Sequence, residues 1–356
     1  MLTITSYLKE IFEDFKKHCD EETQSMKELK DFMNGIKKNS PRNGADEMTS
    51  IYNTSAKLQL YLLKYAYAYG FEYLAMCNEF IKDFADKEEI SVVSLGCGTM
   101  LEYWALANVL NMREKDEADK GEAEKKVFWP IVKYLGVDAI KWNYSMETEE
   151  RDRDRVKFSQ ESFEHFFARQ DNKFNTYDVY FFPKSISEFT NNTMELLLNN
   201  LSEIKKDTIY FCVTLRKQNR LTADDVRKVQ MIIDRLEEEK TGFLVKELKC
   251  IADTEDVKND LKKCGLQKEI DNLIRLGANK QIWTTNIAKS LKYDEISYDD
   301  INQYIKALNQ KCKHKSSKDK PCEGCRESDV PCEMNREQRM TNTKYICDLI
   351  IKFERR

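Results

Sequence analysis

The run VVSLGCGTMLEYWAL, residues 92–106, is the feature that most constrains the fold, because an apolar strand passes through two glycines directly into a helix. Glycines between a strand and a helix allow a tight turn and let a ligand lie against bare backbone. Thr99 and Glu102 stand three residues apart, which predicts a capping box at the helix start. Ligands of open α/β sheets bind at the carboxyl ends of the strands, so this turn predicts a ligand site.

The turn lacks the residues that grip phosphate. A dinucleotide site requires a third glycine where this chain has Leu101, and a P-loop requires a Gly-Lys-Ser/Thr sequence that is absent. The turn therefore suits a nucleoside ligand without phosphate. A second apolar strand, VKYLGVD, ends in Asp138, and an acid at this place can accept both hydroxyls of a ribose. Its separation from Gly98 exceeds the spacing of about 20 residues typical of such sites. The charged residues 112–126, expected to form a solvated loop or a helix extension, account for most of the excess.

Apolar runs alternating with helical patterns continue along the middle of the chain and predict a parallel sheet covered on both faces. The predicted strands are residues 91–95, 132–137, 156–159, 177–182 and 208–215, with two later β-like runs at 243–251 and 345–353. The predicted organisation is a helical N-terminal region (1–86), an α/β core (87–253), a helical and Cys-rich insertion (254–343) and a final core strand (344–356).

The segments SLGCGTMLE, GVD and YDVYFFPKSISEF resemble the class I (Rossmann-like) methyltransferases that use S-adenosylmethionine (AdoMet). The resemblance covers about residues 85–253 and the last strand, and it implies a seven-stranded sheet. It implies that the glycine loop holds the methionine and ribose portions of AdoMet, that Asp138 binds the ribose and that residues after the third strand flank the adenine. The implied cofactor residues are Ser94, Gly96, Cys97, Gly98, Glu102, Asp138, Gln160, Glu161, Phe182 and Pro183.

Two residues depart from the family pattern. Ser94 replaces the usual acid before the first glycine, and Met100 replaces the third glycine of the loop. Either departure weakens the expected amino-acid end of the site, so a degenerate fold that serves as a scaffold stays an alternative to an active enzyme.

The resemblance also implies that the loop after the fourth strand faces the methyl group and the acceptor, and the candidate catalytic residues of this loop are Lys184, Ser185 and Glu188. Methyl transfer is an in-line displacement that depends mainly on positioning, so no fixed triad is expected. The loop lacks the Asn/Asp-Pro-Pro-aromatic and Pro-Cys signatures of two nucleic-acid-modifying classes. A solvated turn at Lys184 and Ser185, and a surface carboxylate at Glu188, are the alternative interpretations.

Four cysteines near the C-terminus, Cys312, Cys322, Cys325 and Cys332, lie in a polar segment with no core to bury them. Such a set predicts a structural zinc site; an iron–sulfur cluster and free thiols are the alternatives. The neighbouring lysines make residues 311–326 locally basic, which suits an RNA or DNA acceptor, although acidic residues dilute the charge.

The formal net charge of −4 gives no global bias towards nucleic acid, and no apolar run is long enough for a membrane span. The 11 cysteines without a signal peptide indicate a reducing, cytoplasmic compartment. The sequence therefore predicts an AdoMet-dependent methyltransferase, with RNA slightly favoured as acceptor. A small-molecule methyltransferase, with the helical N-terminus as a lid, is the first alternative.

Overall fold

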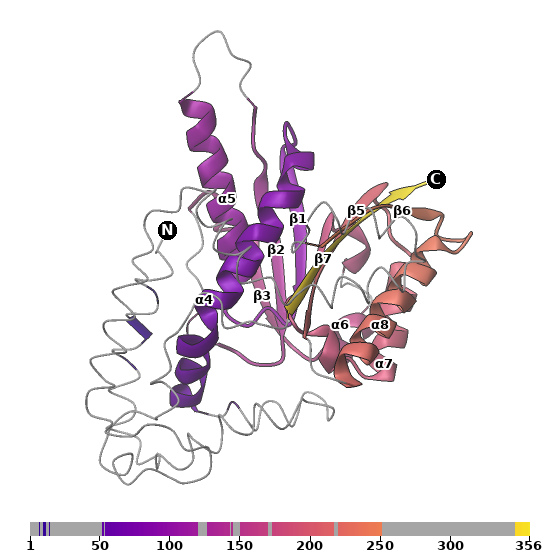
Figure 1. The fold of residues 1–356 in the computed structure, drawn as a ribbon, viewed down its shortest axis with the longest axis horizontal. Coiled ribbons are helices and arrows are strands. Elements are labelled where there is room, and N and C mark those ends of the chain that lie inside the picture. The colour runs from indigo at the N-terminus through magenta and orange to yellow at the C-terminus, as the bar shows by residue number, and fades with distance from the viewer. Residues whose placement is uncertain are drawn as a thin grey trace.

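The computed structural model describes residues 7, 10, 11, 14, 52, 54–119, 127–142, 144, 150–169, 173–216, 220–250 and 346–356. Within these ranges the chain forms one seven-stranded sheet with helices on both faces (Figure 1). The strands are β1 (Glu89–Leu95), β2 (Ile131–Asp138), β3 (Val156–Gln160), β4 (Val179–Phe182), β5 (Thr208–Arg216), β6 (Phe243–Cys250) and β7 (Ile346–Arg355). The helices are α4 (Ser55–Phe80), α5 (Leu101–Ala118), α6 (Phe163–Ala168), α7 (Asn191–Leu201) and α8 (Arg220–Glu237).

The sheet order is β3-β2-β1-β4-β5-β7-β6. Strands β1 to β5 are parallel to their neighbours, whereas β7 runs antiparallel between β5 and β6. This order, with its single reversed strand, is that of the class I methyltransferase fold, so the predicted fold is confirmed. The apolar run at 345–353 forms the predicted final strand of the sheet, the ten-residue β7, which pairs with β5 although the two are far apart in sequence.

Helices α4 and α5 pack together over one face of the sheet, and α6, α7 and α8 cover the other (Figure 1). Buried residues of α4 recur at helical spacing and form the stripe that faces the sheet: Leu58, Leu62, Ala66, Tyr73 and Cys77. Tyr7 and Ile11, from the N-terminal region, belong to the same core. The charged segment predicted after residue 112 is a helix extension at first, because α5 continues to Ala118.

Capping residues in the sequence explain where α6 and α7 begin, but the capping box expected for α5 does not form. Ser162 and Thr190 cap α6 and α7, since each side-chain oxygen accepts a backbone N–H three residues on. The capping box predicted at Thr99 is wrong. Met100 is the N-cap of α5, in a left-handed conformation (φ 63°), and no side chain caps this helix.

The predicted insertion, residues 254–343, lies outside the described residues, as do the four candidate zinc ligands Cys312, Cys322, Cys325 and Cys332 and the basic residues 311–326. Among the residues that are described, no group of His, Cys, Asp or Glu is suited to hold a metal ion. No helix of the described ranges is long and apolar enough to cross a membrane.

Candidate cofactor site

The carboxyl ends of the parallel strands bring most of the predicted site residues to one edge of the sheet. Leu95, the last residue of β1, pairs with Val137, so the glycine loop begins next to Asp138 at the end of β2. Asp138 in turn pairs with Gln160, the last residue of β3. The backbone N–H of Gly96 donates to the Val137 carbonyl over 2.7 Å, which fixes the start of the loop against β2.

The two glycines of the loop have different reasons to be glycine. Gly96 has a φ of 80°, and a methyl group added there would lie 2.6 Å from Cβ of Ser185 in the loop after β4. Gly98 also has a positive φ, 53°, but its nearest neighbour would be the Trp142 ring at 3.8 Å. Close approach of two loops therefore requires the first glycine, whereas backbone conformation alone favours the second.

Asp138 closes the loop through its carboxylate. One oxygen accepts the Gly98 N–H at 2.8 Å and the other accepts the Ile140 N–H at 2.9 Å. Burial raises the pKa of Asp138 to about 6, and these hydrogen bonds oppose that shift. Each carboxylate oxygen has a second lone pair, so the group can still accept the hydroxyls of a ribose.

Glu102 lies beneath the loop, on the α5 side of the sheet. Its Oε1 accepts the hydroxyls of Ser94 on β1 and Tyr134 on β2, each at 2.5 Å. Burial is the main cause that raises the pKa of Glu102 to about 7, against the effect of these two hydrogen bonds. The hydroxyl at the position of the missing acid is thus bonded to a carboxylate supplied by the next helix.

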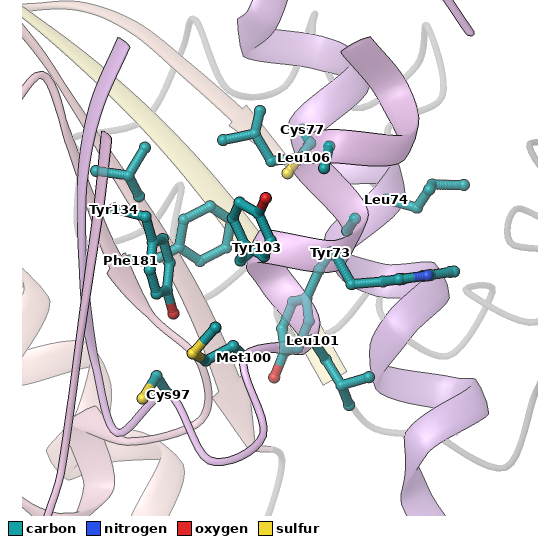
Figure 2. Packing of buried hydrophobic residues seen from close by; sticks show 14 of the residues in the cluster. Tyr73, Leu74, Cys77, Cys97, Met100, Leu101, Tyr103, Leu106, Tyr134 and Phe181 are labelled. Carbon is teal, nitrogen blue, oxygen red and sulfur yellow. The ribbon is translucent and has the colours of Figure 1, made fainter. Parts of the chain in front are cut away.

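Cys97 turns its side chain into the protein. A methyl group at Gly136 would lie 2.6 Å from Cys97 Sγ, so the thiol packs directly on β2, next to Tyr134. Figure 2 shows Cys97 and Met100 together at the base of the loop, between the strands and α5. The thiol is free and buried, and burial raises its pKa well above the usual value. Cys97 could therefore contact a ligand only through its backbone.

After β3, Gln160 is exposed, whereas the Glu161 carboxylate is engaged by three neighbours. It lies 2.8 Å from Nδ1 of His165 and 3.1 Å from the Arg169 guanidinium, and it accepts the Ser159 hydroxyl. Of the two residues predicted to flank an adenine, Gln160 has the less encumbered side chain.

The loop after β4 is buried, so its interpretation as a solvated turn is wrong. Lys184 is 2% exposed, and its ammonium lies 2.5 Å from the buried Glu72 carboxylate of α4 and 4.2 Å from the centre of the Tyr69 ring. Its φ of 60° is left-handed, and its N–H donates to Thr214 Oγ1 at 2.8 Å. This conformation points the Lys184 side chain at α4.

Ser185 is also buried, and its hydroxyl, packed against Gly96, has no hydrogen-bond partner. Glu188, the third catalytic candidate, is half-buried at the end of a short 3₁₀ helix, Ile186–Glu188. Phe182 and Pro183 are buried at the end of β4, and the Phe182 ring belongs to the core of the α6–α8 face. Of these residues, Ser185 is the one that lies against the glycine loop, through its contact with Gly96.

Sequence reasoning missed three members of this site: Glu72, Tyr134 and Trp142. Glu72 had a usable signal, because it is a lone carboxylate in the apolar and aromatic run KYAYAYGFEYLAMC. Tyr134 is one residue of an ordinary strand pattern and gave no signal. Trp142 packs against Gly98 and against the ring of Tyr61, with ring centres 5.4 Å apart, and only the fold brings these residues together.

No protein-family model matches the sequence, and no curated protein matches it. Solved structures do match, at low identity. The plantazolicin methyltransferase BpumL in complex with SAH is 9% identical, with a TM-score of 0.34 and coverage of 97% of this chain and 99% of that one. A SAM-dependent methyltransferase from Thiobacillus denitrificans is 15% identical (TM-score 0.30; 80% and 91% covered). A cyclopropane synthase from Mycobacterium tuberculosis is 8% identical (TM-score 0.33; 79% and 83% covered). The strand order of this chain identifies its fold independently of these matches.

Proposed function

We propose that this chain is an AdoMet-dependent methyltransferase that acts on a small molecule held beside the loop after β4, in a site that helix α4 encloses on one side. The observation that carries the cofactor assignment is the contact of Asp138 with Gly98 at the carboxyl edge of the sheet. This contact places a carboxylate that could accept ribose hydroxyls directly beside a glycine turn that lacks phosphate-binding residues. The buried, unpaired hydroxyl of Ser185 adds a polar group to the same place.

The proposal of a small acceptor rests on helix α4, which covers the loop after β4. Lys184 and Glu72 join this loop to α4 through a buried ion pair, and Tyr69 covers the ammonium. A site roofed by a helix suits a compact acceptor better than a long polymer. The preference for RNA rested on residues 311–326, which lie outside the described ranges, so nothing in the described residues supports it.

The bound cofactor would supply an activated methyl group, and the protein's task would be to hold the acceptor in line with it. Gly96 and Ser185 set the distance between the two loops that flank this position. Lys184 fixes the loop after β4 against α4, and Glu188 stands at the half-buried end of the same loop as the candidate base for a protonated acceptor.

Calorimetric titration with AdoMet and S-adenosylhomocysteine tests the cofactor assignment. We expect the wild type to bind, and we expect Asp138→Ala to lower the affinity about 100-fold or more. The substitution removes both the proposed acceptor of the ribose hydroxyls and the carboxylate that accepts the Gly98 N–H. Asp234→Ala, at an exposed position of α8, is the matched control and should bind normally. A wild-type protein without affinity for either compound would overturn the assignment and favour the scaffold alternative.

The acceptor class needs a separate experiment. The wild type is incubated with methyl-labelled AdoMet and, in parallel, with small-metabolite, peptide, RNA and DNA fractions. We expect label in the metabolite fraction. Label that appears in RNA or DNA instead would contradict the enclosed acceptor site while leaving cofactor binding intact.

A further inference from the structure

Glu102 is an incompletely satisfied buried carboxylate at the base of the glycine loop. It is 2% exposed. Both hydroxyls that reach it, from Ser94 and Tyr134, bond to the same oxygen, Oε1. Its other oxygen, Oε2, is buried and has no hydrogen-bond partner. A buried carboxylate oxygen without a donor is costly, so the arrangement leaves a place for a donor that the described protein does not supply.

No cation among the described residues pairs with Glu102. The titratable groups that face it are Asp138 and Cys97 near the loop, Tyr134 on β2, and Tyr73 and Cys77 on α4. Figure 2 shows Tyr73 and Cys77 on the helix side of this cluster and Tyr134 on the strand side. These groups are acidic or neutral, so none of them neutralises a charge on the Glu102 carboxylate. A positively charged donor would therefore suit Oε2 best.

Glu102 lies next to Ser94, one of the two residues that depart from the family pattern. Ser94 occupies the place where the resembling family carries an acid, and the Ser94 hydroxyl contacts the Glu102 carboxylate directly. Helix α5 thus supplies a carboxylate that is hydrogen-bonded to the residue standing in place of the strand acid. Glu102 also stands in the first turn of α5, where the helix dipole favours a negative charge.

We propose that Glu102 replaces the missing strand acid and accepts the α-ammonium group of the methionine portion of AdoMet. This inference rests on the proposed function and specifies which residue reads the amino-acid end of the ligand. The ammonium supplies the donor that Oε2 lacks, and Ser94 and Tyr134 hold the carboxylate in place through Oε1. Binding below neutral pH then releases a proton, because the raised pKa leaves part of Glu102 protonated before the cation arrives.

The test compares S-adenosylhomocysteine with its deaminated analogue, which lacks only the α-amino group, on wild type and Glu102→Gln. We expect the wild type to prefer the amino compound about tenfold or more, the usual worth of a charge-assisted hydrogen bond. Glu102→Gln should lose this preference and bind the deaminated analogue as the wild type does. Ser94→Asp in the Glu102→Gln background should restore part of the preference. Glu195→Gln, on the exposed side of α7, is the control that should change nothing.

The outcomes separate this inference from the cofactor assignment. A wild type that binds S-adenosylhomocysteine but does not distinguish the deaminated analogue overturns the role of Glu102 alone. The same holds if Glu102→Gln keeps the full preference. A wild type that binds neither compound overturns the proposed function and this inference together. Because the wild-type comparison needs no variant, an absent preference overturns the inference even if Glu102→Gln fails to fold. The wild-type preference should also weaken as pH falls below 7.

Discussion

The two faces of the sheet are built from different side chains. Towards α6, α7 and α8 the strands present an apolar and aromatic surface: Val93, Leu95, Phe182, Phe211 and Val213. The buried exceptions, Tyr180 and Ser91, both have satisfied hydroxyls: Tyr180 donates to the Phe174 carbonyl at 2.9 Å, and Ser91 donates to the Asp178 carboxylate. Towards α4 and α5 the strands also carry buried polar side chains: Ser94, Tyr134, Thr214 and Asp348.

The polar side chains of the α4/α5 face concentrate at the carboxyl end of the strands, where the glycine loop and the loop after β4 meet. Glu72 and Glu102, the buried carboxylates of the two covering helices, bond to groups at this same end. Apolar packing stabilises the fold without leaving polar groups to satisfy, whereas a buried polar network destabilises it unless every polar group has a hydrogen-bond partner. Departures from the apolar rule are expected where function requires them. The difference is consistent with one face that chiefly stabilises the fold and another that carries the proposed site.

The largest expected effect comes from the apolar face. Phe211 stacks on Tyr180 and Phe182, with ring centres 4.8 and 5.8 Å away, and meets Phe353 edge-on. Phe211→Ala removes these contacts and leaves a cavity, so we expect a loss of about 4 kcal/mol in the free energy of unfolding. Urea denaturation measures it. Any folded fraction should bind S-adenosylhomocysteine normally, and a selective loss of binding would contradict the division between the faces.

The second effect comes from the ion pair that joins the loop after β4 to α4. Lys184→Met leaves the buried Glu72 without its cation and should cost about 3 kcal/mol of unfolding free energy. The double variant Glu72→Leu/Lys184→Met removes both charges, so its stability should return to within about 1 kcal/mol of wild type. Methyl transfer by the double variant should stay low. A fully active double variant would show that the pair has only a structural role.

The apolar face and the strand order were predictable because continuous apolar runs carry their own signal. The runs that became β1, β2 and β4 lie within two residues of the observed strands. The polar face was less predictable. Lys184 and Glu72 are 112 residues apart, and their pairing depends on a left-handed backbone at Lys184 that no residue preference announces. Glu102 satisfied the pattern of a capping box, but two strand hydroxyls engage its carboxylate instead.

A third effect, which depends on pH, follows from the buried Glu102. Its pKa is about 7 in the folded protein against an ordinary value of 4.5. Between pH 4.5 and 7, Glu102 is therefore mostly protonated in the folded state and mostly ionised in the unfolded state. Stability therefore falls as pH rises from 4.5 to 7, by about 3 kcal/mol in total from this group. Glu102→Gln should flatten this part of the curve. Urea denaturation from pH 5 to 8 measures it, with Glu195→Gln as control, and parallel wild-type and variant curves would contradict the prediction.

The smallest expected effect separates the two glycines of the loop on the polar face. Gly98→Ala meets no atom closer than the Trp142 ring at 3.8 Å, so its cost is the left-handed conformation alone, about 1 kcal/mol. Gly96→Ala adds a contact of 2.6 Å with Cβ of Ser185, and the loop after β4 must move to relieve it. We therefore expect Gly96→Ala to unfold at lower urea and to weaken S-adenosylhomocysteine binding more than Gly98→Ala does. Equal stabilities for the two variants would mean that the loop after β4 does not press on the glycine turn. In that case the polar face would lack the close contact between loops that fixes the geometry of the site.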